Sequence, residues 1–329
     1  MSEISAAIGF NLIVISPTIA LVGTALVLLF FTITIESNEI VKKSITFLGM
    51  LITSFCVFLK FGLFFENGVS SYFTQKILLD EFSLFGNVLI SLILLFNFLP
   101  IWDSSKQLKE KTTEAIILTL MSASGFMLMV DSENLIMLFI GLEIGSISLY
   151  ALAGLNRGDK LSNEASLKYF LLGSLASCIL IYGVSLVYVS FSVFSVYNFA
   201  LGIAYVGPDS VPLTTSIGVL LIFIGLLFKI AAAPFQSWAP DVYQGSPTGY
   251  VGFMSSIAKV SSFIVIARLC LVSINFIIED FNIFFLIVII SSALIGSLFA
   301  SIQEDLKRLL AYSGVVQSGF ILSGIVSGI

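Results

Sequence analysis

The stretch LLIFIGLLFKIAAAPFQSW, residues 220–238, decides the fold. An apolar run leads into Lys229, and Pro234 follows five residues later. A charge at the centre of a bilayer costs between about 3 and more than 10 kcal/mol, and proline cannot donate a hydrogen bond to the carbonyl of Ile230. We therefore predict a membrane helix that is broken just beyond Lys229. Broken helices occur at membrane depth where the backbone lines a wet cavity or is buried in protein.

The composition agrees with a membrane protein. Of the 329 residues, 58% are hydrophobic and 11% are charged, and the mean hydropathy is +1.09. The net charge of −5 and the absence of a basic cluster argue against a nucleic-acid partner. There is no histidine, and the three cysteines lack CxxC spacing, so no metal site can be read. We therefore expect the chain to be embedded in a lipid bilayer.

Apolar runs of span length recur along the whole chain. A helix needs about 20 apolar residues to cross the hydrocarbon core, and only a helix satisfies its own backbone there. We predict an all-α, polytopic transmembrane bundle of about ten spans. These lie near residues 9–35, 44–65, 80–101, 113–130, 133–155, 164–191, 214–237, 248–275, 281–302 and 307–329. The longest polar stretches are about 102–112 and 198–213, too short for a soluble domain.

Basic residues in the connections predict the orientation. With the N-terminus outside, the inner connections carry nine basic residues: Lys42, Lys43, Lys106, Lys109, Lys111, Arg157, Lys160, Lys307 and Arg308. The outer connections then carry one, Lys76. Because lysine and arginine accumulate on the inner side of membrane proteins, we expect the N-terminus outside.

Five basic residues fall inside predicted spans. Lys60 and Arg268 lie near span ends, so we expect their side chains to reach the interface by snorkelling. Lys168 follows Glu164 by four residues, the favourable order for a helical ion pair. Either a structural pair or a place in a proton relay fits Lys168.

The other charged residues lie deeper. Lys259 is in the middle of FMSSIAKVSSFIVIARL, residues 253–269, among serines whose hydroxyls could hold water. Glu143 lies in the middle of LIMLFIGLEIGSISLYALAG, residues 135–154, between Gly141 and Gly145. This GxxxG pattern permits close helix packing. Glu143 is either kept neutral by burial or paired with a lysine of a neighbouring helix, and we favour the pair.

One deep glutamate and two deep lysines suggest a proton relay. Burial disfavours the charged form of a lysine, whereas a nearby carboxylate favours it. A change in the distance between them would therefore release or take up a proton. On these grounds Glu143, Lys229 and Lys259 are the predicted relay residues, with Lys168 added less directly and Pro234 marking the helix break.

Four segments resemble the antiporter-like subunits of respiratory complex I. KIAAAPFQSWAPDVYQGSPT (229–248) is similar to their broken helix, and LFIGLEIGSISLYALAG (138–154) to their glutamate helix. EASLKYFLLGSLASCILIYG (164–183) and QEDLKRLLAYSGVVQSGFIL (303–322) also resemble family segments. The motif PDVYQGSP resembles the subunit N branch more than the L and M paralogues.

The resemblance implies a membrane-arm subunit of proton-pumping NADH:ubiquinone oxidoreductase. It implies that Glu143 pairs with Lys229, that Lys259 carries protons toward the centre, and that Lys168 belongs to a charged axis. NADH, FMN, iron–sulfur clusters and quinone would be used in other subunits, so no cofactor is expected in this chain. The expected partners are other membrane-arm subunits, including the antiporter-like paralogues.

The chain departs from the family pattern in two ways. Glutamine stands at Gln236 and Gln317, where the family often has histidine. Family members usually have about fourteen helices built around two inverted five-helix repeats. We therefore expect N-terminal helices over 1–110, one repeat over 111–277, and the start of a second over 278–329. The missing helices and the later lysine would come from a second polypeptide or from sequence beyond residue 329, or the proton exit route would differ from that of the family.

Two other functions stay open. A subunit of a cation/proton antiporter uses related helices without a redox partner. A structural scaffold with an inactive channel would fit the incomplete second repeat. The expected location is the mitochondrial inner membrane, slightly favoured by SWAPDVYQGSPT (237–248), or the bacterial plasma membrane.

Overall fold

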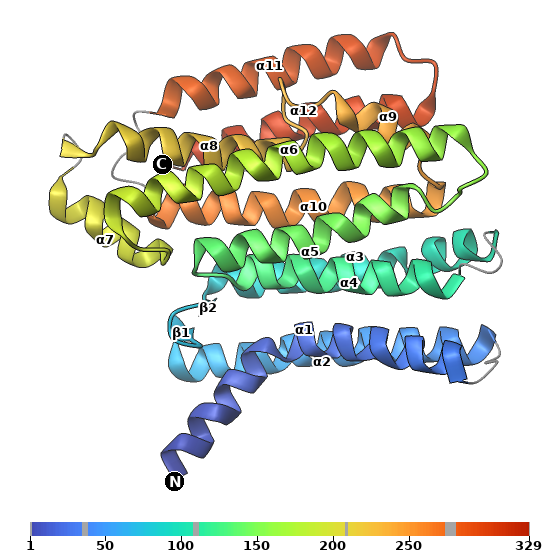
Figure 1. Cartoon of the computed structure of the whole chain (residues 1–329), viewed down its shortest axis with the longest axis horizontal. Coiled ribbons are helices and arrows are strands. Elements are labelled where there is room, and N and C mark those ends of the chain that lie inside the picture. The colour runs from blue at the N-terminus through green and yellow to red at the C-terminus, as the bar shows by residue number, and fades with distance from the viewer. Residues whose placement is uncertain (1, 35–38, 108–111, 208–209, 274–280, 329) are drawn as a thin grey trace.

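A computed structural model describes residues 2–34, 39–107, 112–207, 210–273 and 281–328. Long helices run roughly parallel in this structure (Figure 1). In chain order the elements are α1 (Ser2–Thr34), α2 (Glu39–Asn67), β1 (Ser70–Tyr72), β2 (Ile77–Leu79), α3 (Glu81–Gln107), α4 (Thr112–Asp131), α5 (Leu135–Ala153), α6 (Lys160–Phe191), α7 (Val196–Val206), α8 (Leu213–Lys229), α9 (Trp238–Gly245), α10 (Thr248–Arg268), a π-helical turn (Leu269–Ser273), α11 (Asn282–Ser301) and α12 (Leu306–Ser327).

The two ends of the bundle differ. One end carries the β1–β2 hairpin and α7, and we call it the hairpin end (Figure 1). The other carries the connections between α5 and α6 and between α11 and α12. Arg157 lies in the first connection, and Lys160, Lys307 and Arg308 lie in the first turns of the helices that follow. We call this end the basic end. The basic end thus carries residues that the sequence assigns to the inner connections, whereas Lys76, assigned to the outer connections, lies in the hairpin.

The predicted helical membrane bundle is confirmed. Within the described residues, nine helices are long and apolar enough to span a membrane. The seventh predicted span, 214–237, is interrupted: α8 ends at Lys229 and α9 begins at Trp238. The antiparallel hairpin of β1 and β2 was not predicted. The stretch 198–213, expected as a polar connection, holds most of α7, whose N-terminus is capped by Ser195.

Helices α4 and α5 pack with their backbones in close contact. A Cβ atom added at Gly141 would lie 2.5 Å from the backbone nitrogen of Met129 and 2.8 Å from the carbonyl oxygen of Gly125. Glycine is therefore required on this face of α5 because any side chain would push the helices apart. The contact holds Glu143 in a fixed position relative to α4.

Replacing Gly141 by alanine should destabilise the protein. The new methyl group meets backbone atoms that cannot rotate away, and such overpacking costs about 1–3 kcal/mol. A Gly62→Ala variant is the matched control, because nothing lies within 4 Å of a Cβ at that helical position. We expect a lower thermal unfolding midpoint in detergent for Gly141→Ala and an unchanged or higher one for Gly62→Ala. Equal midpoints would refute the close packing.

Candidate functional site: a broken helix between buried lysines

The non-helical segment between α8 and α9 is held by side chains from other elements. The Ser292 hydroxyl of α11 accepts a hydrogen bond from the Ala233 amide at 2.9 Å. The Ser318 hydroxyl of α12 lies 2.8 Å from the carbonyl oxygen of Ile230. The Trp238 indole donates to the carbonyl of Phe228 at 3.0 Å. These bonds replace those that a continuous helix would make, so the break is satisfied inside the protein.

Lys229 is the last residue of α8 and is buried. Its ammonium group donates to the hydroxyl of Tyr150 at 2.9 Å and to that of Ser146 at 3.1 Å. Its Nζ also lies 5.5 Å from the centre of the Tyr150 ring. Both partners belong to α5, the helix of Glu143. The buried lysine therefore has neutral oxygen partners and no carboxylate in direct contact among the described residues.

Glu143 is on α5, one turn before Ser146. Its carboxylate accepts a short hydrogen bond from the Ser177 hydroxyl of α6. It interacts electrostatically with Lys229, but the two residues do not form an ion pair within the described structure. The direct Glu143–Lys229 pair expected from the sequence is therefore not formed among the described residues: Glu143 contacts Ser177, Lys229 contacts Ser146 and Tyr150, and the two charges interact only at a distance.

Lys259 of α10 is connected to the break through α12. Its Nζ donates to the carbonyl oxygen of Gly314 at 2.9 Å. The Ser318 hydroxyl lies 2.8 Å from that same oxygen and 2.8 Å from the Ile230 carbonyl. The Gly314 carbonyl and the Ser318 hydroxyl of α12 therefore connect Lys259 to the carbonyl of Ile230, the residue directly after the end of α8. The role of Ser318 was not predicted, because serine occurs throughout these helices and nothing in the sequence distinguishes this one.

The two glutamines at usual histidine positions differ in environment. Gln236 lies in the non-helical segment, and its buried Oε1 has no hydrogen-bond partner among the described residues. Gln317 is on α12 and is exposed. Pro234 lies in the same non-helical segment as Gln236.

Lys168 belongs to a charged network at the basic end. It bridges Glu164 at 2.7 Å, as the sequence predicts, and Asp241 of α9 at 2.6 Å. Asp241 also pairs with Arg308 of α12 at 2.6 Å. One carboxylate therefore ties the short helix α9 to both α6 and α12. Asp241 lies within the motif PDVYQGSP, which was the available signal for its importance.

The expected snorkelling of Lys60 and Arg268 is wrong. The Lys60 side chain is 0% exposed, and its Nζ lies 2.8 Å from Asp131, the last residue of α4. Arg268 makes a two-pronged ion pair with Asp80 through bonds of 2.6 and 2.9 Å. Both cations are buried between helices and neutralised there, because acids from distant parts of the sequence meet them.

Comparison with known proteins identifies the family. Residues 132–329 match the family model described as NADH:quinone oxidoreductase/Mrp antiporter, TM. The chain belongs to this transmembrane family. The family match covers all the relay candidates and the broken helix, and the resemblance inferred from the sequence is confirmed.

The chain is also similar to several named proteins. The NADH-quinone oxidoreductase subunit N of Trichlorobacter lovleyi is 38% identical over 78% of this chain and 53% of its own length. That of Hydrogenovibrio crunogenus is 33% identical over 92% of this chain and 62% of its own. A chain of respiratory complex I from Thermus thermophilus with bound aureothin has a TM-score of 0.77 at 27% identity, covering 95% of this chain and 64% of its own. The chain therefore spans between half and two thirds of the length of these relatives.

Replacing Ser318 by alanine should destabilise the break. The Ile230 carbonyl would lose its partner in a buried site, which costs about 1–3 kcal/mol. Ser323→Ala is the control on the same helix, because the Ser323 hydroxyl donates to the carbonyl of Phe320 within that helix. We expect a lower unfolding midpoint for Ser318→Ala alone. Equal stability of the two variants would contradict the role of Ser318.

Removing one partner of the Lys60–Asp131 pair should cost more than removing both. Lys60→Met leaves a buried carboxylate without its cation, and such a break costs about 3–5 kcal/mol. The double variant Lys60→Met/Asp131→Asn should recover most of this loss in membrane-extracted protein. Exposed Lys76→Met serves as the control. If Lys60→Met is as stable as Lys76→Met, the pair is not a buried structural contact.

Proposed function

We propose that this chain is a membrane-arm subunit of a proton-translocating NADH:quinone oxidoreductase. The observation that carries the proposal is Lys229, a buried lysine at the end of a broken helix with only neutral direct partners among the described residues. The subunit N relatives support it, as does the complex I chain of similar fold. Redox chemistry, with its NADH, FMN, iron–sulfur clusters and quinone, would take place in other subunits.

The arrangement allows a proton to be held and released at Lys229. A buried ammonium group needs either a counter-ion or several oxygen partners to remain charged. Lys229 has two hydroxyl partners, and the Glu143 carboxylate is near but not in contact. A small movement of α5 relative to α8 would change that electrostatic interaction and hence the proton affinity of Lys229. Such a change is what coupling to a remote reaction requires.

We propose Lys259 as the next proton-binding group. The Ser318 hydroxyl and the Gly314 carbonyl connect its ammonium group to the break beside Lys229. The carbonyl itself cannot carry a proton, so transfer between the lysines would use water along this polar line. Lys168 would act at the basic end, where its ion pairs with Glu164 and Asp241 set the charge around α9.

We place the basic end on the inner side of the membrane, following the bias of lysine and arginine. The N-terminus and the hairpin end would then face the periplasm or intermembrane space. We further propose that residues 111–277 form one repeat and that residues 278–329 begin a second. In the whole protein, a further segment or a second chain would supply the remaining helices and an exit lysine.

Replacing Lys229 by methionine tests the proposal in the assembled complex. Methionine fills a similar volume but binds no proton, so we expect proton translocation per NADH oxidised to fall several-fold or be lost. The measurement is the proton-to-electron ratio in proteoliposomes, with pH-gradient and quinone-reduction assays run together. Exposed Lys76→Met is the control and should pump normally. Normal pumping by Lys229→Met with intact quinone reduction would overturn the relay.

The family model also covers Mrp antiporters, which gives a second candidate function. Purification separates the two. Co-isolation with flavin and iron–sulfur subunits supports the oxidoreductase, whereas cation/proton exchange by a complex without redox subunits supports the antiporter. A scaffold with an inactive channel predicts that Glu143→Gln and Lys259→Met leave pumping unchanged while Gly141 substitutions disrupt assembly.

A further inference from the structure

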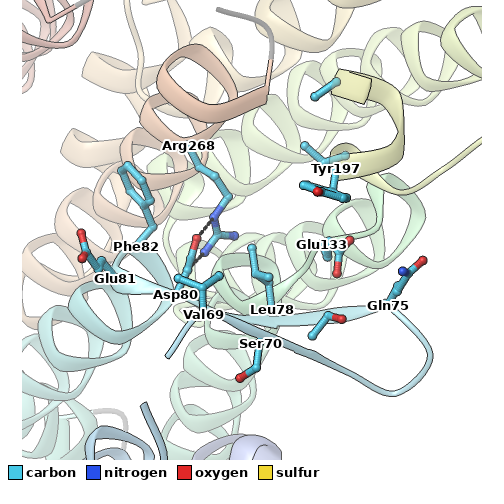
Figure 2. Close-up of a pocket in the computed structure, with 13 residues that line it drawn as sticks. Val69, Ser70, Gln75, Leu78, Asp80, Glu81, Phe82, Glu133, Tyr197 and Arg268 are labelled. Atoms are coloured by element: carbon cyan, nitrogen blue, oxygen red, sulfur yellow. Dashed lines mark hydrogen bonds and ion pairs between the residues drawn. The ribbon is translucent and has the colours of Figure 1, made fainter. Parts of the chain in front are cut away.

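A pocket of about 610 Å³ opens at the hairpin end, away from the lysines of the broken helix. Figure 2 shows its lining, which comes from the β1–β2 hairpin, the start of α3, the α4–α5 turn, α7 and the end of α10. The exposed residues Val69 and Glu81 are part of this lining, so water can enter. Glu133, in the turn between α4 and α5, lines it too.

Arg268, the cation of this pocket, is directed to groups other than Glu133. Its Nε and Nη2 atoms donate to the two oxygens of Asp80, as the dashed lines in Figure 2 show. Its Nη1 atom donates to the carbonyl of Val130 at 2.7 Å and approaches that of Ser132 at 3.2 Å. In the described structure Arg268 forms its ion pair with Asp80, and Glu133 receives no direct salt bridge from it.

Glu133 is 4% exposed, and its carboxyl group has a single hydrogen-bond donor among the described residues. The Ser195 hydroxyl donates to its Oε1 at 3.0 Å. Its Oε2 is buried and has no partner there. An ionised carboxylate offers about four acceptor sites and is costly to bury with so few donors. A protonated carboxyl group needs fewer hydrogen-bond donors around it, because its hydroxyl can itself donate a hydrogen bond.

The surroundings act on this carboxyl in opposing directions. Burial raises the pKa of Glu133, while the Ser195 hydrogen bond and the positive field of Arg268 oppose the rise. The N-terminus of α5, which begins two residues later, also favours the ionised form. The carboxyl groups of Asp80 and Glu81 line the same pocket, and the Lys76 side chain is exposed. Burial is the largest of the effects on Glu133.

We infer that Glu133 is a proton-binding site at the hairpin end, exchanging its proton with water in the pocket. The proton moves from the Glu133 carboxyl group to a water molecule of the pocket, which leaves carboxylate and hydronium, so no other reactant is needed. The ligand is the proton itself, and the site is separate from Glu143, which lies about 15 Å further along α5. This inference goes beyond the relay and concerns equilibrium protonation, so it stands or falls independently of pumping.

Carbodiimide labelling of the intact complex tests the site. A hydrophobic carbodiimide adds to a protonated carboxyl and rearranges to a stable N-acylurea, which mass spectrometry locates in the Glu133 peptide. Because burial raises the pKa of Glu133, we expect the labelling of Glu133 to persist to a higher pH than the labelling of Glu81. Exposed Glu81, on the rim of the same pocket, is the internal reference.

Two variants and a second measurement complete the test. Glu133→Gln should remove the adduct and one carboxyl C=O band from the pH-difference infrared spectrum, whereas Glu81→Gln should keep both. Ser195→Ala should raise the Glu133 midpoint further, since it removes the donor that favours ionisation. Labelling of Glu133 and Glu81 over the same pH range would overturn the inference. Absence of both the adduct and the infrared band in the unmodified protein would overturn it as well.

Discussion

The peptide groups released after Lys229 must find hydrogen-bond partners inside the protein, because lipid offers none. This constraint organises the C-terminal half of the described structure. Ser292 of α11, Ser318 of α12 and Trp238 at the start of α9 each supply a bond to the break. The segment after α8 can leave the helical conformation because α11 and α12 supply hydrogen-bond partners to it. Lys229 therefore stands at the end of a helix rather than in its interior.

Buried charges in this protein fall into two groups with different partners. At the hairpin end, Lys60 and Arg268 meet carboxylates at 2.6–2.9 Å. Closely paired charges of this kind are costly to separate and fix the helices that carry them. In the middle of the bundle, Lys229 and Lys259 contact hydroxyl and carbonyl oxygens. Neutral partners hold these lysines less firmly in one charge state, which suits groups that bind and release protons.

The sequence predicted the helices well because span length and apolarity are local properties. It also located the break, since a continuous membrane helix accommodates a lysine followed closely by a proline only at a high cost. It failed for Lys60 and Arg268, whose acids lie 71 and 188 residues away in the chain. Ser318 and Asp241 were missed for the same reason: their importance comes from which helices pack together. The hairpin was too short to show any alternating pattern.

The sharing of Asp241 between Lys168 and Arg308 has a mechanical consequence. Helix α9 is fastened at the basic end to α6 and α12 at once, while its other end continues into the unwound segment. A shift of α12 would therefore act on α9 through Asp241, and the non-helical segment that follows Lys229 joins α9 to α8. The two ion pairs of Asp241 thus couple the position of α9, and with it the non-helical segment after Lys229, to the positions of α6 and α12.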